Sequence, residues 1–258
     1  MTIKKAIRTL QSEFWFLKNA KDTFYFYYRR LLRVPHDKDF EALAIVREEE
    51  GSRGCYIDIG GNQGQSIESI HLYKPMARIE CFEPNRALCD KLIARYAGSK
   101  QVKIRNVGLS DKSARLKLFV PSYKDFVYDG LASLDYNSAR SWLNRDTVYF
   151  FSPGDLKLIE LECRVETLDS FRLEPIFIKI DVQGIEYEVV KGGVDTLRMH
   201  EPILLIEAFD DDPRLGALLA SLGYEDYQYR NGSLVRGRNG GNNTFLMTRK
   251  RFETTIEH

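Results

Sequence analysis

The stretch YIDIGGNQGQS, residues 56–66, runs from an apolar segment through an acid into glycines and amides. This order is typical of a buried strand that ends in a tight turn and continues into a helix. Such a turn binds a phosphate, binds a nucleoside without phosphate, or has no ligand. The segments around it predict the fold, and the residues of the turn decide among the ligands.

Short apolar runs alternate with helical segments from residue 54 onward. The expected strands contain GCYIDIG, ARIECFEP, VKIRNVGLS, IFIKIDVQG and PILLIEAF, followed by strands near residues 224–230 and 244–248. The expected helices span about residues 65–73, 86–97, 185–198 and 213–222. This alternation predicts an α/β fold, in which helices cover both faces of a mainly parallel sheet.

Residues 1–50 precede this pattern and are predicted to form an N-terminal helical extension. Residues 1–33 are basic and aromatic, and their apolar side chains are too dense for a free solvated helix. They are expected to pack on the domain, on a partner protein or on a membrane surface. The segment PHDKDFEALAIVREEEG is expected to form a further helix, capped by Asp37 or Asp39 and ended by Gly51.

Residues 51–258 are expected to form one α/β domain with an insert at about residues 121–157. The segments that flank the insert, ARLKLFV and LKLIELECRV, alternate like strands with one exposed face. The insert is aromatic and rich in turn residues, which argues against disorder. We expect a lid or a wall of the substrate site, with plain structural packing as the alternative.

The composition argues against several classes of protein. Thirty-eight basic and 37 acidic residues leave a net charge of +1, which argues against nucleic acid held mainly by charge. The four cysteines and four histidines show no metal-ligand spacing. The first residues lack the apolar core of a secretion signal, and no apolar run is long enough to cross a membrane. A cytoplasmic location is expected, with the aromatic N-terminal region available to the inner face of a membrane.

In an open parallel sheet, ligands bind beyond the carboxyl ends of the strands. The residues at those ends are Gly60–Gly64, Glu83, Asn106–Ser110, Asp181 and Glu207. A dinucleotide site would require G-x-G-x-x-G, but this pattern fails when it is started at Gly60, because Asn62 and Gln65 replace the later glycines. The turn also lacks G-x-x-x-x-G-K-S/T, which excludes that type of phosphate loop.

Asp58 lies two residues before the first glycine, where a carboxylate repels a pyrophosphate and favours a cationic ligand. S-adenosylmethionine fits, since it has no phosphate and carries a sulfonium and an ammonium group. Gly60, Gly61 and Gly64 allow a nucleoside to approach the backbone, and Glu83 stands where an acid accepts ribose hydroxyls. The alternatives are a strand–helix turn without a ligand and, for Glu83, a surface acid before a proline.

The chain resembles the FkbM-type methyltransferases, S-adenosylmethionine-dependent enzymes that mostly methylate hydroxyls on sugars and natural products. The resemblance covers about residues 54–208 and rests on YIDIGGNQGQS, ECFEPN, NVGLSD, VETLDSF, IKIDVQGIEYEVVKGG and PILLIE, in that order. It implies a Rossmann-like class I methyltransferase fold with a seven-stranded sheet whose last strand is antiparallel. One departure is Gln183, which stands where the family often has an acid.

The family pattern implies S-adenosyl-L-methionine as the cofactor. The implied contacts are Asp58, Gly60, Asn62, Gly64, Ser66, Glu83, Pro84 and Asn85, with the adenine near Val107 and Gly108. Gly61, Gln65 and Asp181 lie at the same strand ends and complete the candidate cofactor-binding residues.

Methyl transfer to a hydroxyl needs the acceptor oxygen in line with the methyl carbon, and a base that takes the hydroxyl proton. Asp181 is the first candidate for this base or for a group that orients the acceptor, and Glu207 is the second. Lys179 shares a face with Asp181 and can pair with it, whereas Glu186 is expected to anchor the next turn. The alternative for these acids is helix capping. Asp181 and Glu207 could also hold magnesium, but their spacing does not require a metal.

These observations predict an O-methyltransferase whose acceptor is a hydroxyl of a small molecule or glycan, with a sugar as the expected acceptor. The alternatives are a non-catalytic protein that keeps the fold and binds a partner, and a nicotinamide-dependent oxidoreductase, which the failed fingerprint disfavours. An N-methyltransferase is disfavoured because DVQG, residues 181–184, replaces the Asn/Asp-Pro-Pro-Tyr/Phe motif. Asn231-Gly232 is expected to form a turn, and RGRNGGNN, residues 236–243, a mobile loop or a basic flap over an anionic substrate.

Overall fold

The computed structural model describes residues 5–6, 8–10, 27–47, 54–207, 209, 212–237 and 243–255. Most of the aromatic N-terminal stretch, the predicted helix end at Gly51 and most of the glycine-rich stretch lie outside the described residues. No helix within the described ranges is long and apolar enough to cross a membrane. The division of the chain at residue 50 stays a prediction.

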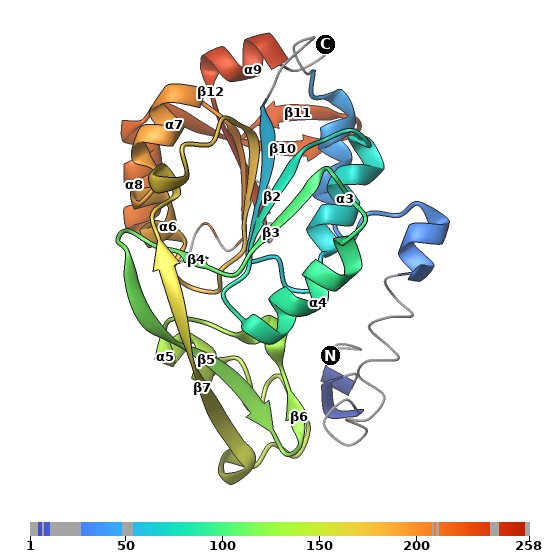
Figure 1. Cartoon of the computed structure of the whole chain (residues 1–258), viewed down its shortest axis with the longest axis vertical. Helices are drawn as coiled ribbons and strands as arrows, with labels where there is room; N and C mark the ends of the chain where they lie inside the picture. Colours follow the sequence, from blue (N-terminus) through green and yellow to red (C-terminus); the bar gives the residue numbers. More distant parts are fainter. Residues whose placement is uncertain are drawn as a thin grey trace.

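Eight strands form the main sheet of the described residues, and helices cover both of its faces (Figure 1). β3, β2, β1, β8 and β9 are parallel to one another, whereas β12 runs antiparallel to β9 and to β10. The α/β fold and its antiparallel C-terminal part therefore agree with the prediction. In spatial order the strands are β11 (Ser233–Arg236), β10 (Tyr224–Arg230), β12 (Asn243–Thr248), β9 (Ile203–Glu207), β8 (Pro175–Ile180), β1 (Cys55–Ile59), β2 (Ile79–Phe82) and β3 (Val102–Arg105).

The prediction of seven strands was wrong by one strand. Residues 233–236 fold back on β10 as β11, with Arg230 opposite Ser233. Asn231 and Gly232, the turn predicted from the sequence, have φ angles of 50° and 83°. Two positive φ angles are what the central residues of a two-residue hairpin turn require, and this turn adds the extra edge strand.

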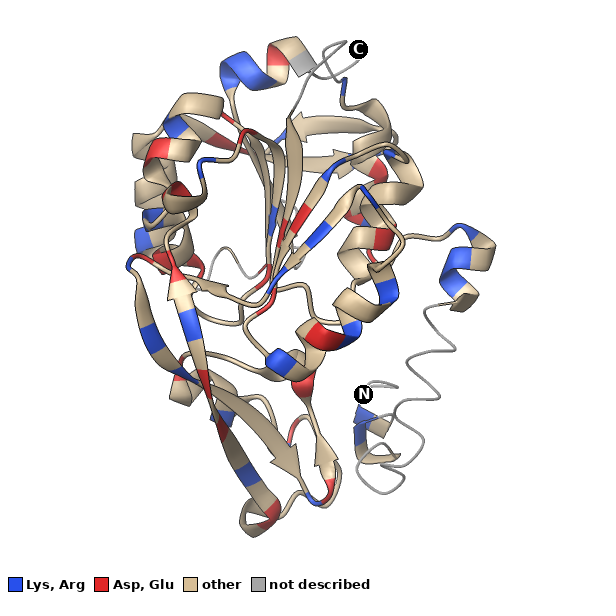
Figure 2. Cartoon of the chain, viewed as in Figure 1, with Lys and Arg blue, Asp and Glu red and all other residues tan. Residues whose placement is uncertain are grey.

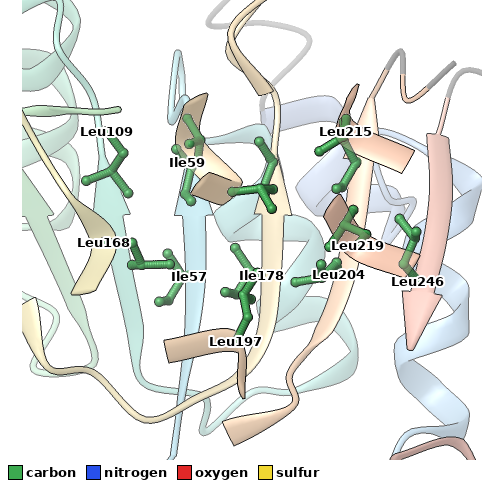
Figure 3. Packing of buried hydrophobic residues seen from close by; sticks show 14 of the residues in the cluster. Ile57, Ile59, Leu109, Leu168, Ile178, Leu197, Leu204, Leu215, Leu219 and Leu246 are labelled. Carbon is green, nitrogen blue, oxygen red and sulfur yellow. The ribbon is translucent and has the colours of Figure 1, made fainter. Parts of the chain in front are cut away.

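Side-chain alternation along the strands separates two hydrophobic layers. Tyr56 and Phe177 belong to the core that includes η2, α3 and α4. Ile57 and Ile178 belong to the opposite core, under α6, α7 and α8 (Figure 3). Because both faces are buried, any polar side chain in these strands needs compensation. The bounds of the helices are η2 (Lys38–Ile45), α3 (Gln65–Tyr73), α4 (Arg86–Tyr96), α6 (Glu186–Lys191), α7 (Val194–His200), α8 (Pro213–Ser221) and α9 (Arg249–Thr255).

The single helix expected at residues 185–198 is broken into α6 and α7, which a pair of glycines separates. The second helix has its own N-terminal partner. The Asp169 carboxylate accepts hydrogen bonds from the amides of Asp195 and Thr196, at 3.2 and 2.8 Å. Because Asp169 lies on a distant segment, helical periodicity could not reveal this break.

The helix expected at residues 35–51 is a 3-10 helix, η2, that ends at Ile45. Asp37 is its cap, since its side chain accepts a hydrogen bond from the Asp39 amide at 2.9 Å. Phe40 and Leu43 are fully buried and pack in the same core as the main sheet. This segment therefore covers the sheet near the ends of β1 and β8.

The insert belongs to a second sheet that projects from one end of the main sheet (Figure 1). β5 and β7 are strands, as their alternation predicted, and they pair antiparallel with each other. Tyr123, Phe126 and Tyr128 form a small aromatic core within the insert. The elements of this region are β4 (Gly108–Leu109), β5 (Ala114–Tyr123), β6 (Phe126–Val127), η3 (Asp129–Leu131), α5 (Tyr136–Ser141), η4 (Pro153–Asp155), β7 (Leu156–Glu166) and η5 (Leu168–Phe171).

The packing of the protein itself requires the glycine turn after β1. Gly60 has a φ of 88°, and a Cβ there would lie 1.9 Å from the carbonyl oxygen of Asp181. A Cβ at Gly61 would lie 2.2 Å from the sulfur of Cys81. These glycines are therefore needed for contact with the neighbouring strands, whether or not a ligand approaches the turn.

Gly60→Ala is expected to lower the free energy of unfolding by more than about 1 kcal/mol, because an L residue is strained at this φ and its Cβ displaces a carbonyl. Chemical denaturation measures the change. Gly98→Ala is the control, since nothing lies within 4 Å of a Cβ at that position. Equal stability of the two variants would show that the turn tolerates a Cβ.

Candidate active site

Four neighbouring strands bring carboxyl groups to one edge of the main sheet. Asp58, Glu83, Asp181 and Glu207 lie at or just beyond the ends of β1, β2, β8 and β9, which are adjacent in the sheet. Figure 2 shows acidic segments near the middle of the molecule, where the main sheet meets the insert. Glu83, Asp181 and Glu207 share one edge, as the strand order predicted, and Asp58 lies one residue before the end of β1.

Glu83 ties the glycine turn to the end of β2. Its Oε2 atom accepts a hydrogen bond from the Asn62 amide, and its Oε1 atom accepts one from the Asn85 amide, both at 2.7 Å. Burial raises the pKa of Glu83 to about 7, although the two amides lower it. Each carboxylate oxygen has a second lone pair, so Glu83 can still accept hydroxyl groups from a ligand.

A pocket of about 610 Å³, mouth included, lies at this edge, and we call it the central pocket. The insert forms part of its wall through Asp129, Gly130, Ala132 and Leu134, and Leu118 of β5 lies beside them. This agrees with the interpretation of the insert as a wall, although the insert also packs around its own core. The predicted cofactor-binding residues that line the pocket are Gly60, Asn62, Glu83, Pro84, Gly108 and Asp181.

The other predicted cofactor-binding residues do not line the central pocket. Asn85 caps α4, because its Oδ1 atom accepts a hydrogen bond from the Ala87 amide at 3.0 Å. Val107 packs in the hydrophobic core. The structure therefore gives several of these residues a structural role near the turn. The residues outside the pocket lining are Asp58, Gly61, Gly64, Gln65, Ser66, Asn85 and Val107.

Asp58 lies behind the turn and is 1% exposed. Its Oδ1 atom has no hydrogen-bond partner within the described part of the chain. Burial raises the pKa of Asp58 to about 7, against the lowering effect of the Lys179 ammonium on the adjacent strand. Asp58 can therefore act on a ligand in the central pocket only through its charge, without touching the ligand.

Asp181 and Glu207 form a hydrogen-bonded acid pair. Burial raises the pKa of Asp181, but the Lys179 ammonium and hydrogen bonds from Glu207 and Gln183 outweigh it and lower the pKa below its usual value. Burial and the neighbouring Asp181 raise the pKa of Glu207 to about 8. Near neutral pH the pair therefore shares one proton, and the opposite directions of the two pKa shifts favour its place on Glu207.

Gln183 bridges this acid pair, which the sequence did not predict. Its Nε2 atom donates to Asp181 at 2.7 Å and approaches Glu207 at 3.5 Å. Its Oε1 atom is buried without a hydrogen-bond partner among the described residues. An amide at this position neutralises no charge, but it supplies a donor that an acid could not supply while ionised. Glu186 accepts a hydrogen bond from the Gly184 amide at 3.1 Å, so it anchors the turn that precedes it rather than the following turn that the sequence predicted.

Lys179 lies in the interior of the main sheet and is 2% exposed. Its Nζ atom donates to the Oδ1 atom of Asn243 at 2.8 Å. Asn243 in turn donates to Asp37 at 2.9 Å and to Asp39 at 3.1 Å. The sequence predicted that Lys179 pairs with Asp181. The Lys179 charge does lower the pKa of Asp181, but the Lys179 hydrogen bond goes to Asn243. The sequence indicates that Lys179, in a buried strand, needs a hydrogen-bond acceptor, but it does not indicate that Asn243 is this acceptor.

A family model described as the methyltransferase FkbM domain matches residues 58–230, more than half of the chain. This chain belongs to the FkbM methyltransferase domain family. The match includes all four acids of the sheet edge. The resemblance seen in the sequence is therefore confirmed.

Several known proteins are similar to this FkbM domain. The 2-O-methyltransferase NoeI of Sinorhizobium fredii (strain NBRC 101917 / NGR234) is 28% identical over 150 residues, which cover 55% of this chain and 58% of that protein. The chain thus matches less than two thirds of the length of that relative. A crystal structure of methyltransferase FkbM from Methylobacillus flagellatus KT aligns with a TM-score of 0.49 at 17% identity, covering 82% of this chain and 48% of that one. A precorrin-6y C5,15-methyltransferase from Geobacter metallireducens GS-15 aligns with a TM-score of 0.38 at 13% identity, covering 80% and 83%.

Within the described residues of this FkbM domain, no group of three or more His, Cys, Asp and Glu side chains is arranged to hold a metal ion. Asp181 and Glu207, whose residue types also suit magnesium, are hydrogen-bonded to each other instead.

Glu207→Gln is expected to raise the melting temperature, and to raise it more as the pH increases from about 5 to about 8. The pKa of Glu207 is about 8 in the folded chain against an ordinary value of 4.5, so between these values folding retains a proton that the unfolded chain has released. The higher pKa of Glu207 in the folded chain lowers the stability of the wild type as the pH rises. Glutamine does not titrate, so the variant lacks this loss of stability. Differential scanning calorimetry across the pH range measures the effect.

The control is Glu162→Gln, which changes an exposed acid of β7. Its melting temperature is expected to follow that of the wild type at every pH. A Glu207→Gln variant whose offset from the wild type does not change with pH would contradict the raised pKa.

Proposed function

We propose that this FkbM domain is an S-adenosylmethionine-dependent O-methyltransferase that acts on a hydroxyl of a sugar in a glycan, glycolipid or natural product. The observation that carries the proposal is the acid pair of Asp181 and Glu207 at the edge of the central pocket. The family supports a methyltransferase, and the relative named as a 2-O-methyltransferase supports oxygen as the acceptor atom.

The residues of the central pocket fit S-adenosylmethionine. The Oδ1 atom of Asn62 and the Oε1 atom of Gln183 are buried acceptors without partners among the described residues, and both residues line the pocket. Asp181 and Asp129 add acidic groups to the lining, which suits a cationic ligand. When bound, the cofactor supplies a methyl group on a positively charged sulfur.

The proposed cofactor contacts divide between two ends of the pocket. Glu83 would accept hydrogen bonds from the ribose hydroxyls with its remaining lone pairs. Pro84 and Gly108 would pack against the adenine, since both line the pocket and lie next to each other. The turn from Gly60 to Asn62 would lie against the methionine part.

The acid pair would handle the acceptor hydroxyl. Asp181 is ionised and would take the proton that the hydroxyl loses as its oxygen bonds to the methyl carbon and the carbon–sulfur bond breaks. Glu207 is protonated and would orient the acceptor by hydrogen bonding. Lys179 would keep Asp181 ionised at the pH at which it acts as a base.

S-adenosylhomocysteine is expected to bind the purified chain at micromolar concentration, and NAD is expected not to bind. Glu83→Ala should weaken the binding about tenfold or more, because charge-assisted hydrogen bonds contribute about 1.5–3 kcal/mol. Isothermal titration calorimetry measures both. Glu80→Ala is the control, because Glu80 pairs with Arg105 at 2.7 Å and does not line the central pocket. A wild-type chain that binds neither compound would favour the non-catalytic alternative.

Asp181→Asn is expected to keep the affinity for S-adenosylhomocysteine and to lose turnover by about 100-fold or more, since it removes the base. Release of S-adenosylhomocysteine with a methylated sugar acceptor measures turnover. Asp169→Asn is the control, because Asp169 caps α7 away from both carboxyls of the pair. Wild-type turnover in Asp181→Asn would exclude Asp181 as the base.

A further inference from the structure

A second cavity lies between the insert and the main sheet, and we call it the outer pocket. It holds about 1470 Å³, mouth included, and Gln183 and Glu207 are among its lining residues. Gln183 also lines the central pocket. The two pockets therefore meet at the acid pair, which places an acceptor in one of them next to a methyl donor in the other.

The insert holds one large aromatic ring, that of Trp142, at the wall of the outer pocket. Trp142 is 37% exposed. Its segment is held in shape by side chains that bind the backbone. The Thr147 hydroxyl donates to the Trp142 carbonyl, and the Asn144 amide donates to the Ser141 carbonyl, both at 2.9 Å. A large aromatic ring on a backbone segment that is held in place can pack on the C–H face of a sugar ring.

The insert is packed directly on the turn that carries Gln183. The Ser133 hydroxyl donates to the Gln183 carbonyl at 2.6 Å. A Cβ at Gly184 would lie 2.6 Å from the Ser138 hydroxyl, so the Ser138 side chain packs closely on the Gly184 backbone. This packing couples the position of Trp142 to the position of the acid pair.

The described lining of the outer pocket contains one cation, Arg214, which is already paired. Its guanidinium donates to the Asp212 carboxylate at 2.6 Å and to Glu188 at 3.4 Å. Glu186 also lines this space, and none of the described lining residues supplies a free cation. A phosphate group would lose hydration beside the Glu186 carboxyl without gaining a cation from these residues, whereas a neutral or ammonium-bearing sugar would not meet this cost.

We propose that the outer pocket binds the acceptor sugar, with the ring against Trp142 and the reacting hydroxyl at Glu207 and Gln183, and that it selects uncharged or amine-bearing sugars over phosphorylated ones. This inference rests on the proposed function, because it names the acceptor site and the chemical class of the acceptor. This acceptor class differs from the anionic substrate that was one interpretation of the basic stretch at residues 236–243.

Saturation-transfer NMR on the full chain, with saturating S-adenosylhomocysteine, tests this site with glucose, glucosamine and glucose 6-phosphate as probes. Glucose and glucosamine are expected to bind, and glucose 6-phosphate to bind at least about fivefold more weakly because of its charge. Trp142→Ala is expected to weaken the first two at least about fivefold by removing the stacking face. Phe150→Ala is the matched control, since Phe150 is an aromatic residue of the insert that is 97% exposed and does not line the outer pocket.

A gain-of-binding variant keeps the test decisive if Trp142→Ala affects folding. Ser141→Lys adds a cation at an exposed position of the lining and is expected to strengthen glucose 6-phosphate binding about threefold or more. Three results would overturn the proposal: tighter wild-type binding of glucose 6-phosphate than of glucose, unchanged binding in Trp142→Ala, or no binding of any probe.

Calorimetry with S-adenosylhomocysteine on the same preparations distinguishes a failure of the proposed function from a failure of the outer-pocket assignment. A chain that does not bind it overturns the proposed function and the acceptor site together. A chain that binds it but fails the sugar tests overturns the assignment of the outer pocket alone.

Discussion

The buried ammonium of Lys179 is the constraint on which the site depends. A lysine that is 2% exposed inside a sheet needs nearby negative charge and a hydrogen-bond acceptor, since an uncompensated buried charge costs on the order of several kcal/mol. Asn243 of β12 supplies the acceptor, and Asp37 and Asp39 hold Asn243 from the η2 side. One buried charge therefore joins the N-terminal segment and the last strand behind the edge where the acids converge.

The same ammonium separates the protonation states of the acids around it. Lys179 and Gln183 favour the ionised form of Asp181, while Glu207 keeps its proton and shares a hydrogen bond with Asp181. A carboxylate next to a carboxylic acid can accept a proton while its neighbour donates a hydrogen bond. The proposed chemistry thus follows from the charge balance inside the sheet.

The insert controls the other side of the site. Residues 129–134 form part of the wall of the central pocket, and Trp142 forms part of the wall of the outer pocket. The insert has an aromatic core of its own, so its surface can vary without loss of the packing that holds it. In the proposed function, the sheet edge supplies the acids and the insert shapes the space of both pockets.

Local patterns in the chain were sufficient for most of the fold and for the positions of the acids. Strand alternation and helical periodicity are local properties, so α3 was predicted with its observed bounds, and Glu83, Asp181 and Glu207 were predicted at one edge. The break between α6 and α7 was missed although Gly192 and Gly193 are a local signal for it, and the cap from Asp169 that begins α7 lies 27 residues before Thr196. The acceptor for Lys179 was missed because Asn243 lies 64 residues away along the chain. Only the folded arrangement decided which acid carries a charge and which keeps a proton, because burial and distant neighbours determine both the pKa values and the hydrogen bonds.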